Sequence, residues 1–276
     1  MAQIISMSII AIHSYRGGAG KTNITASLAT IVASHGHRVG IVDADLHNPG
    51  IYVLFGLNKD HLGYSLNDYL WNNCQITEAD YDVTSVLGLQ DRCQITETDY
   101  DVIAKGKKPT ENSFLSLVPA SMKQEDISRM LREGYDVRLL EKGFRTLINE
   151  LNLDFLFVDT HPGLNEEVLI SLTLSDTLVL IMKPDQQDFQ ATGIMLDLAN
   201  KLNIQKTLLV MNMMIESLGI ERFSHKVKED YGFSLAAIIP WSEDMMMLGS
   251  RGIFSLAFPH HPLTEVLEKL ADKIMN

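Results

Sequence analysis

Short apolar runs alternate along the chain with longer stretches whose apolar residues recur at a helical period. Two of the runs, Phe155–Val158 and Leu178–Ile181, contain only apolar residues, as is typical of strands covered on both faces. The runs predict strands at residues 4–13, 38–43, 114–119, 154–159, 177–182, 207–212 and 234–240. The stretches between them predict helices near residues 21–35, 123–150, 165–174, 187–203, 218–229, 243–250 and 262–275. This alternation predicts an α/β fold with a mostly parallel central sheet and helices on both faces.

Length and composition narrow the class of protein. The chain has 276 residues, 46% of them apolar, so we expect a single domain over residues 1–276 with a buried core. No apolar stretch approaches the roughly 18 residues that a membrane-spanning helix needs, and the N-terminal run lacks the features of a secretory signal. Cys74 and Cys93 are too few for a disulfide framework. These observations predict a soluble, cytoplasmic protein.

The net charge of −12 is unevenly distributed, and residues 60–101 hold nine acidic side chains against one basic side chain. The segment Cys74–Val83 recurs as Cys93–Val102 with nine of ten residues identical. We therefore expect an acidic insert at residues 72–110 that contains a tandem 19-residue duplication. Two interpretations stay open: a duplication tolerated at the surface, or a paired docking surface for a partner. DNA binding relies on basic patches, so the net charge disfavours it.

Residues 15–22 read Tyr-Arg-Gly-Gly-Ala-Gly-Lys-Thr and stand between an apolar strand and a predicted helix. Backbone N–H groups of such a loop, together with the following helix N-terminus, form a site for polyphosphate. Lys21 adds a positive charge, and Thr22 places a hydroxyl where Mg²⁺ would sit. The usual pattern has Gly at the first position, where this chain has Tyr15. The segment therefore predicts a phosphate-binding loop of unusual type.

Aspartates follow two further predicted strands. Asp43 and Asp45 end one strand and, being two residues apart, project in the same direction. Asp159 ends a second strand and is followed by Thr-His-Pro-Gly. A carboxylate after an apolar strand beside a phosphate loop is the usual outer ligand of a water bound to Mg²⁺. We expect these strand ends to meet beside the phosphate loop, because ligands in such sheets bind at the carboxyl ends of strands.

With this loop, the D-x-D strand end and the D-x-x-P-G strand end, the chain resembles the MinD/ParA family of deviant Walker-A ATPases, which are SIMIBI-class P-loop NTPases. The resemblance implies binding of ATP or ADP with Mg²⁺. It implies metal support by Thr22, Asp43 and Asp159. It also implies that the residues around the phosphates and the adenine are Gly17, Gly18, Ala19, Gly20, Lys21, Thr22, Asn23, Asn212 and Pro240.

The same resemblance implies a Mg²⁺-dependent ATP hydrolase. Lys21 would contact the β- and γ-phosphates, and Asp45 would orient the attacking water. Arg16 stands where the family has a lysine that reaches across an ATP-bound dimer to the partner's phosphates. An arginine keeps the charge but presents a planar fork. Two interpretations of Arg16 stay open: a contact made across the dimer, or a solvated side chain.

Within the family, the resemblance implies an ATP-driven switch that forms a homodimer with ATP. It would position or partition a cargo together with a protein partner that stimulates the ATPase. The C-terminal helix is predicted to pack on the core, because its polar face is mixed and slightly acidic and so unlike a membrane-targeting helix. Two alternatives are a nucleotide-binding scaffold or adaptor with little turnover, and an ATP-dependent biosynthetic synthetase of related fold.

Overall fold

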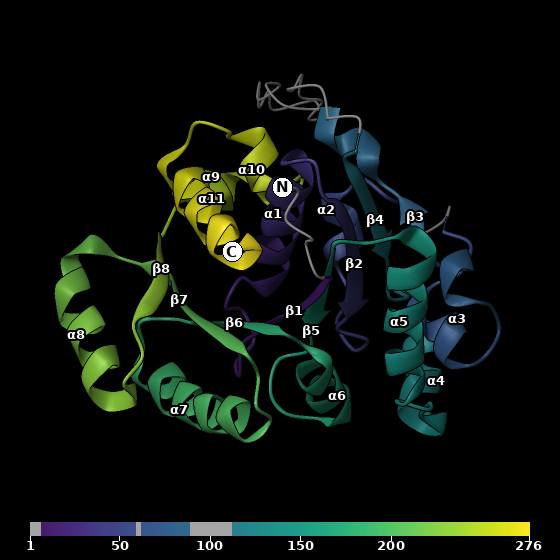
Figure 1. The fold of residues 1–276 in the computed structure, drawn as a ribbon, viewed down its shortest axis with the longest axis horizontal. Helices are drawn as coiled ribbons and strands as arrows, with labels where there is room; N and C mark the ends of the chain where they lie inside the picture. Colours follow the sequence, from purple (N-terminus) through teal and green to yellow (C-terminus); the bar gives the residue numbers. More distant parts are fainter. Residues whose placement is uncertain (1–6, 59–61, 89–111) are drawn as a thin grey trace, which may run out of the picture.

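The computed structural model describes residues 7–58, 62–88 and 112–276, and the strands in this part of the chain form one sheet (Figure 1). The strand order is β3-β4-β2-β5-β1-β6-β7-β8. Neighbouring strands are parallel, except that β3 runs antiparallel to β4. The predicted fold class is confirmed. The strands are β1 (Ser8–His13), β2 (Arg38–Ala44), β3 (Tyr81–Asp82), β4 (Phe114–Val118), β5 (Phe155–Thr160), β6 (Thr177–Met182), β7 (Lys206–Met214) and β8 (Leu235–Pro240).

Helices cover both faces of the sheet (Figure 1). One face packs against α1, α10 and α11, and the other against α5, α6 and α7. None of the described helices combines the length and the apolar character needed to cross a bilayer. The helices are α1 (Lys21–Ser34), α2 (Ile51–Leu54), α3 (Leu66–Leu70), α4 (Gln124–Glu133), α5 (Leu139–Leu151), α6 (Glu166–Leu174), α7 (Gln186–Lys201), α8 (Ile220–Tyr231), α9 (Glu243–Leu248), α10 (Phe254–Ala257) and α11 (Pro262–Met275).

Side chains in the central strands alternate between the two faces, and this alternation places the strand-end aspartates. In β5, Phe155 and Phe157 pack on the α1 side, so Asp159 projects to that side as well. In β2, Asp43 follows Ile41 with the same spacing, and the register pairs Asp43 with Asp159. Both carboxylates therefore lie at the carboxyl ends of adjacent strands, on the face where α1 begins.

The predicted helix over residues 123–150 is wrong as a single element. The chain forms α4, then breaks at Gly134, which has φ 65°, and resumes helix at Leu139. The indole N–H of Trp71 donates to the Gly134 carbonyl at 3.2 Å, which fixes the break against α3. The short helices α2, α3 and α10 were not predicted, because four or five residues carry no recognisable period.

The first copy of the acidic repeat and the C-terminal helix both pack against the rest of the fold. The first copy of the repeat contains β3 and buries Ile76 and Val83, so this copy is packed against the sheet. The second copy, residues 93–102, lies outside the described residues. The apolar stripe of α11 packs against α1, which confirms the prediction of core packing. Its buried members are Leu263, Leu267, Leu270 and Ile274.

Candidate nucleotide-binding site

The loop between β1 and α1 depends on two glycines in the left-handed region. Gly18 has φ 72° and Gly20 has φ 85°. A Cβ on Gly20 would lie 2.5 Å from Asn212 Nδ2, so no larger residue fits there without a shift. Helix α1 begins at Lys21 with no side-chain cap and no acidic residue in its first turn. Its first N–H groups are therefore free to receive an anion.

Lys21 places a buried positive charge at the start of α1. The residue is 6% exposed, and its ammonium donates to Ser14 Oγ at 3.3 Å. Burial lowers the pKa of Lys21, while the carboxylates of Asp159 and Asp45 raise it. A cation held out of water beside uncapped helix N–H groups favours an incoming phosphate, because both attract negative charge.

The three predicted aspartates do come together beside Lys21. Asp43 and Asp159 are each 1% exposed, and Asp43 Oδ1 accepts the N–H of Asp45 at 3.2 Å. Burial raises the pKa of Asp43 well above its ordinary value, and the neighbouring carboxylates of Asp159 and Asp45 raise it further. Burial also raises the pKa of Asp159 to about 6, although Thr22 and Lys21 oppose this shift. Three carboxyl groups thus lie close together beside one lysine, and burial opposes the ionisation of Asp43 and Asp159.

These residues fit a hard divalent cation. Mg²⁺ prefers oxygen ligands and usually binds through one or two carboxylates, phosphate oxygens and retained waters. Thr22 and Asp159 lie within hydrogen-bonding reach of each other and would offer such oxygens. Among the described residues, no three His, Cys, Asp or Glu side chains converge to hold a metal alone.

A cavity of about 300 Å³ lies at the other side of the loop, where the family resemblance predicts the adenine. Asn212 and Pro240 both line it, together with Asn23 and Trp241. The amide of Asn212 donates to the carbonyl of Ala19 at 2.8 Å, so the carboxyl end of β7 is tied directly to the phosphate loop. Trp241, which was not predicted from the sequence, is 52% exposed and offers a flat apolar surface at the cavity mouth.

Arg16 extends from the loop toward solvent rather than into the site. Its side chain is 46% exposed, and its Nε lies 3.6 Å from Asp188 Oδ1 on α7. Asp188 is itself 4% exposed and accepts the N–H of Lys183 at 2.8 Å. The guanidinium thus rests against a fixed carboxylate beside the phosphate loop, with part of it open to water.

Sequence reasoning missed the histidines at this edge of the sheet. His13 is fully buried, and its Nδ1 lies 2.7 Å from Thr160 Oγ1. Burial, with the positive charge of Lys21, lowers the pKa of His13 to about 3, so this ring stays neutral. His161 Nδ1 lies 2.7 Å from Asp45 Oδ1. In the sequence, His161 is recognisable only as a histidine directly after the strand end at Asp159-Thr160. That position alone does not predict a contact with Asp45.

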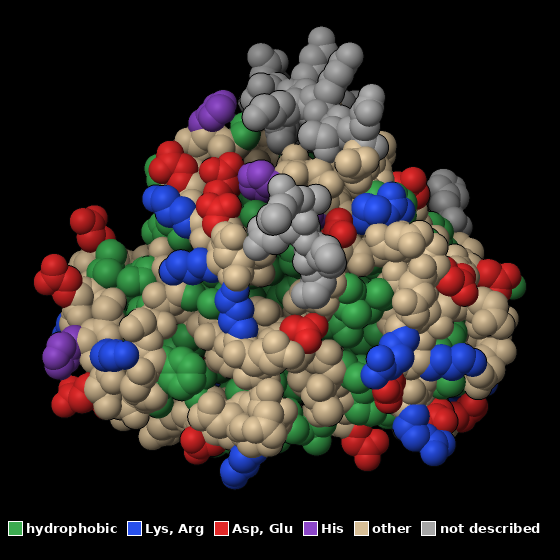
Figure 2. Space-filling view, in the orientation of Figure 1, with side chains coloured by type: hydrophobic (Ala, Val, Ile, Leu, Met, Phe, Trp, Pro, Cys, Tyr) green, Lys and Arg blue, Asp and Glu red, His purple; other side chains and the backbone are tan. Residues whose placement is uncertain are grey.

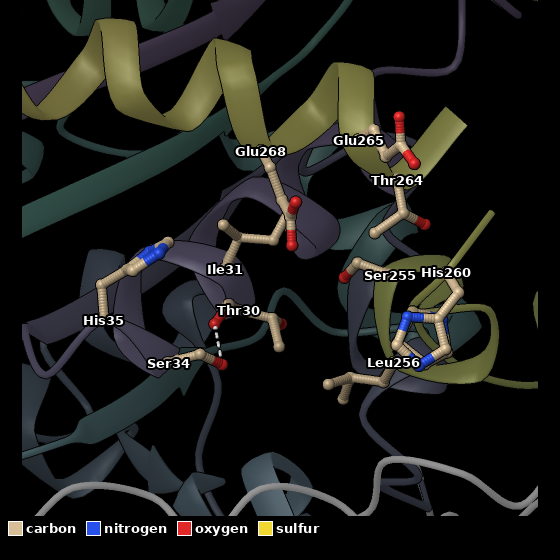
Figure 3. A pocket seen from close by; sticks show the side chains of 11 residues that line it. Thr30, Ile31, Ser34, His35, Ser255, Leu256, His260, Thr264, Glu265 and Glu268 are labelled. Atoms are coloured by element: carbon tan, nitrogen blue, oxygen red, sulfur yellow. Dashed lines mark hydrogen bonds between the residues drawn. The ribbon is translucent and has the colours of Figure 1, made fainter. Parts of the chain in front are cut away.

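A separate cavity of about 570 Å³ lies near the opposite end of α1, between α1, α10 and α11 (Figure 3). Its floor carries hydroxyl groups and its rim carries His35, His260, Glu265 and Glu268. These four side chains are exposed. This cavity shares no lining residue with the one at the phosphate loop.

The fold and this loop define a P-loop NTPase. The chain belongs to the ParA family, since residues 6–275 match the family model described as a NUBPL iron-transfer P-loop NTPase. It is 22% identical to an iron-sulfur cluster carrier protein of Pyrococcus horikoshii, over 97% of this chain and 85% of that protein. It is 23% identical to a putative septum site-determining protein MinD of Emiliania huxleyi, over 88% of this chain and 78% of that protein.

Solved structures show the same fold. The septum site-determining protein MinD of Pyrococcus horikoshii, solved with Mg-ADP, superposes with a TM-score of 0.74 at 19% identity, covering 97% of this chain and 96% of that one. A ParA family ATPase from Chlorobium tepidum superposes with a TM-score of 0.67 at 18% identity, covering 97% and 98% of the two chains. The family resemblance predicted from the motifs is thereby confirmed.

Proposed function

We propose that this protein binds and slowly hydrolyses Mg·ATP and uses the nucleotide as a switch that forms a homodimer in the ATP state. The observation that carries the proposal is the buried constellation of Lys21, Asp43, Asp45 and Asp159 around an uncapped helix N-terminus. In phosphoryl transfer a protein mainly positions groups and neutralises charge, so these few residues suffice.

Each residue has one task in this proposal. The N–H groups of the loop and Lys21 hold the phosphates, while Thr22, Asp43 and Asp159 support Mg²⁺ directly or through water. The cation neutralises charge on the phosphates when it is bound. Asp45 accepts a hydrogen bond from the attacking water and orients it. Asn212 and Pro240, with the Trp241 ring, enclose the base.

Apolar side chains around the nucleotide cavity support the dimer and partner parts of the proposal. Trp241, Met246 and Met247 are between 52% and 68% exposed, and the first two line the cavity itself. Ile215 is 51% exposed as well. It directly follows Met214, whose backbone carbonyl accepts the N–H of Trp241. A surface of this kind beside the ligand lets nucleotide state and protein contact influence each other.

The distribution of charge disfavours DNA as the surface on which this protein would position its cargo. Helix α8 carries four exposed basic side chains, Arg222, His225, Lys226 and Lys228. Two of them face carboxylates one turn away, at 2.6 Å for Lys226–Asp230 and 3.7 Å for His225–Glu229. Figure 2 likewise shows basic and acidic side chains interspersed on the visible face. This local pairing reduces the positive charge that α8 could present to phosphate.

The names of several relatives suggest iron-sulfur cluster transfer as a second candidate, but the described residues do not favour it. Clusters are held by cysteine thiolates. Burial, with the acidic Asp68 and Glu78, raises the pKa of Cys74 to about 11, so this thiol stays protonated at neutral pH. Cys93 lies outside the described residues. We therefore keep the nucleotide switch as the proposed function.

Light scattering with ATP, ADP and no nucleotide, run beside a phosphate-release assay, tests the proposal. We expect a dimer with ATP alone and slow release of phosphate. Asp45→Ala should keep ATP binding within about threefold and lose turnover, whereas Asp197→Ala, an exposed aspartate on α7, should behave as wild type. A constitutive monomer without turnover would favour the adaptor. Turnover that requires an added acceptor substrate would favour the synthetase.

Arg16→Ala separates the two interpretations of that residue. If the guanidinium acts across the dimer, the variant should bind ATP normally but lose turnover by about a hundredfold or more. A solvated arginine would leave both the ATP-dependent dimer and the rate unchanged.

A further inference from the structure

The side chains of His161 and Asp45 form a hydrogen bond between two loops that flank the phosphate site. Nδ1 and Oδ1 are 2.7 Å apart, and the side chains are 27% and 10% exposed, respectively. Asp45 follows β2 and His161 follows β5, and the last register pair of these strands is Ala44 with Thr160. The bond therefore spans adjacent strand ends at the point where the chain leaves the sheet.

The chemistry of the pair sets the direction of the bond. An ionised carboxylate can only accept, so His161 donates to Asp45 through Nδ1–H. Asp45 Oδ1 also accepts the N–H of Asn48 at 3.1 Å. Oδ2 has no hydrogen-bond partner among the described residues. Two donors thus hold one oxygen of Asp45, and the other oxygen is left to accept from water.

The bond is not needed to hold the two strands together. Strands β2 and β5 are already paired over six residues, from Val39 with Phe155 to Ala44 with Thr160. A single partly exposed hydrogen bond adds only about 1 kcal/mol to such a pairing. What this bond does fix is the rotation of the Asp45 carboxylate, because Oδ1 cannot turn away without losing both donors.

We infer that His161 is a positioning residue for Asp45: it holds Oδ1 so that Oδ2 receives the water that attacks the γ-phosphate. This inference rests on the proposed ATP hydrolysis. In that reaction a bond forms between the water oxygen and the γ-phosphorus, and the bond from that phosphorus to the bridging oxygen breaks with its electron pair staying on ADP. The water proton passes to Asp45 Oδ2 and from there to the inorganic phosphate.

The ring of His47 lies against that of His161, with centroids 5.1 Å apart and planes at 52°. This neighbour supports the His161 ring but has no hydrogen bond to Asp45 among the described residues. A phenylalanine at position 161 would keep the ring contact and remove the donor. An asparagine would place an amide N–H close to the position of Nδ1. These two substitutions therefore separate the ring from the hydrogen bond.

Steady-state kinetics of His161→Phe and His161→Asn test the role. We expect the Phe variant to lose kcat by about ten- to a hundredfold while the Kd for ATP stays within twofold. The reason is that the substitution changes only the orientation of the Asp45 carboxylate. The Asn variant should recover kcat to within about threefold of wild type. His35→Ala, which changes an exposed histidine at the far end of α1 (Figure 3), is the matched control and should not differ from wild type.

A readout independent of turnover is the ¹⁵N spectrum of the histidine rings. The wild-type protein should show His161 as the Nδ1–H tautomer, identified by its absence from the Asn variant, and Asp45→Ala should abolish that signal. An Nε2–H tautomer in the wild type would overturn the inference.

The outcomes also separate this inference from the proposed function. If wild type hydrolyses ATP, Asp45→Ala does not, and His161→Phe matches wild type, the positioning role is wrong and the proposed function stands. If wild type binds ATP and never hydrolyses it, the proposed function itself is wrong, and the positioning role is overturned with it.

Discussion

Helix α1 borders a cavity near each of its ends, and the polar side chains at the two ends are satisfied in different ways. At the N-terminal end, Lys21 and the carboxylates of Asp43 and Asp159 are buried, and burial shifts the pKa of each toward its neutral form. At the C-terminal end, Thr30 Oγ1 donates to the Ala26 carbonyl at 2.7 Å.

Two other hydroxyl groups at the C-terminal end also donate hydrogen bonds within the protein. Ser34 Oγ donates to the carbonyl of Thr30 at 2.8 Å, and Thr264 Oγ1 donates to that of Phe258 at 2.7 Å. The charged side chains on the rim are open to water (Figure 3). The cavity at this end is the larger of the two, at about 570 against about 300 Å³. Buried titratable groups with shifted pKa values, rather than cavity volume, therefore mark the N-terminal end of α1 as the candidate ligand site.

The largest expected effect comes from removing the buried cation. Lys21→Ala should weaken ATP binding by about a hundredfold or more, because the phosphates would meet three carboxylates without a compensating charge. Glu268→Ala, at the opposite cavity, should leave the affinity within twofold. Isothermal titration calorimetry measures both. Equal losses in the two variants would show that the comparison between the ends is mistaken.

Glycines at the two ends of α1 offer a second contrast. Gly20→Ala should destabilise the protein by about 2–3 kcal/mol, because φ is +85° and the new Cβ would press on Asn212. It should also weaken nucleotide binding. Gly36→Ala, where φ is +94°, should cost about 1 kcal/mol through backbone strain and leave nucleotide affinity unchanged. Urea unfolding and calorimetry check the pair; an affinity loss in Gly36→Ala would contradict the assignment.

The burial of His13 predicts a pH-dependent stability. Its pKa is about 3 in the folded protein and about 6.5 when exposed, so the unfolded chain takes up a proton first as the pH falls. The stability due to neutral His13 is therefore present above pH 6.5 and is lost as the pH drops toward 3.

The variant His13→Asn removes this titration while keeping a donor for Thr160. Between pH 8 and pH 5, wild type should lose about 2 kcal/mol more unfolding free energy than the variant. Urea unfolding at the two pH values measures the difference. Parallel losses in both proteins would mean that His13 is protonated in the folded state.

The smallest effect is expected at the C-terminal end of α1, where the hydroxyl groups are already hydrogen-bonded. Ser34→Ala removes a hydroxyl at the surface of α1 whose proton is already bonded to the carbonyl of Thr30. We expect a change of at most about 0.5 kcal/mol in unfolding free energy and no change in ATP affinity. A larger loss of affinity would link the second cavity to the nucleotide site.

Local patterns were enough to predict the phosphate loop and the strand-end aspartates. Gly20, Lys21 and Asp43 lie within 24 residues of one another, and each follows or precedes a strand whose period is clear. The parallel sheet then brings Asp159 beside Asp43 by a general rule of such folds. The α/β class and the loop could therefore be predicted from these patterns, whereas the expected position of Asn212 came from the family resemblance.

Contacts between distant segments could not be predicted in the same way. The bond from His161 to Asp45 joins residues 116 positions apart, and neither residue type demands the other. The carbonyl of Gly134, at the break between α4 and α5, accepts the indole N–H of Trp71, a contact that a helical period over residues 123–150 cannot show. Such features depend on packing, which fixes geometry only once the whole sheet is formed.

The central claim is that the N-terminal end of α1 holds a nucleotide through Mg²⁺ and phosphate. Calorimetric titration of the wild-type protein with ATP, in Mg²⁺ and again in EDTA, tests it most directly. We predict one nucleotide bound per chain in Mg²⁺ and affinity at least about tenfold weaker in EDTA, since the buried carboxylates would then face the phosphates unscreened. Absence of binding to the folded protein in Mg²⁺, or equal affinity in the two solutions, would contradict the claim.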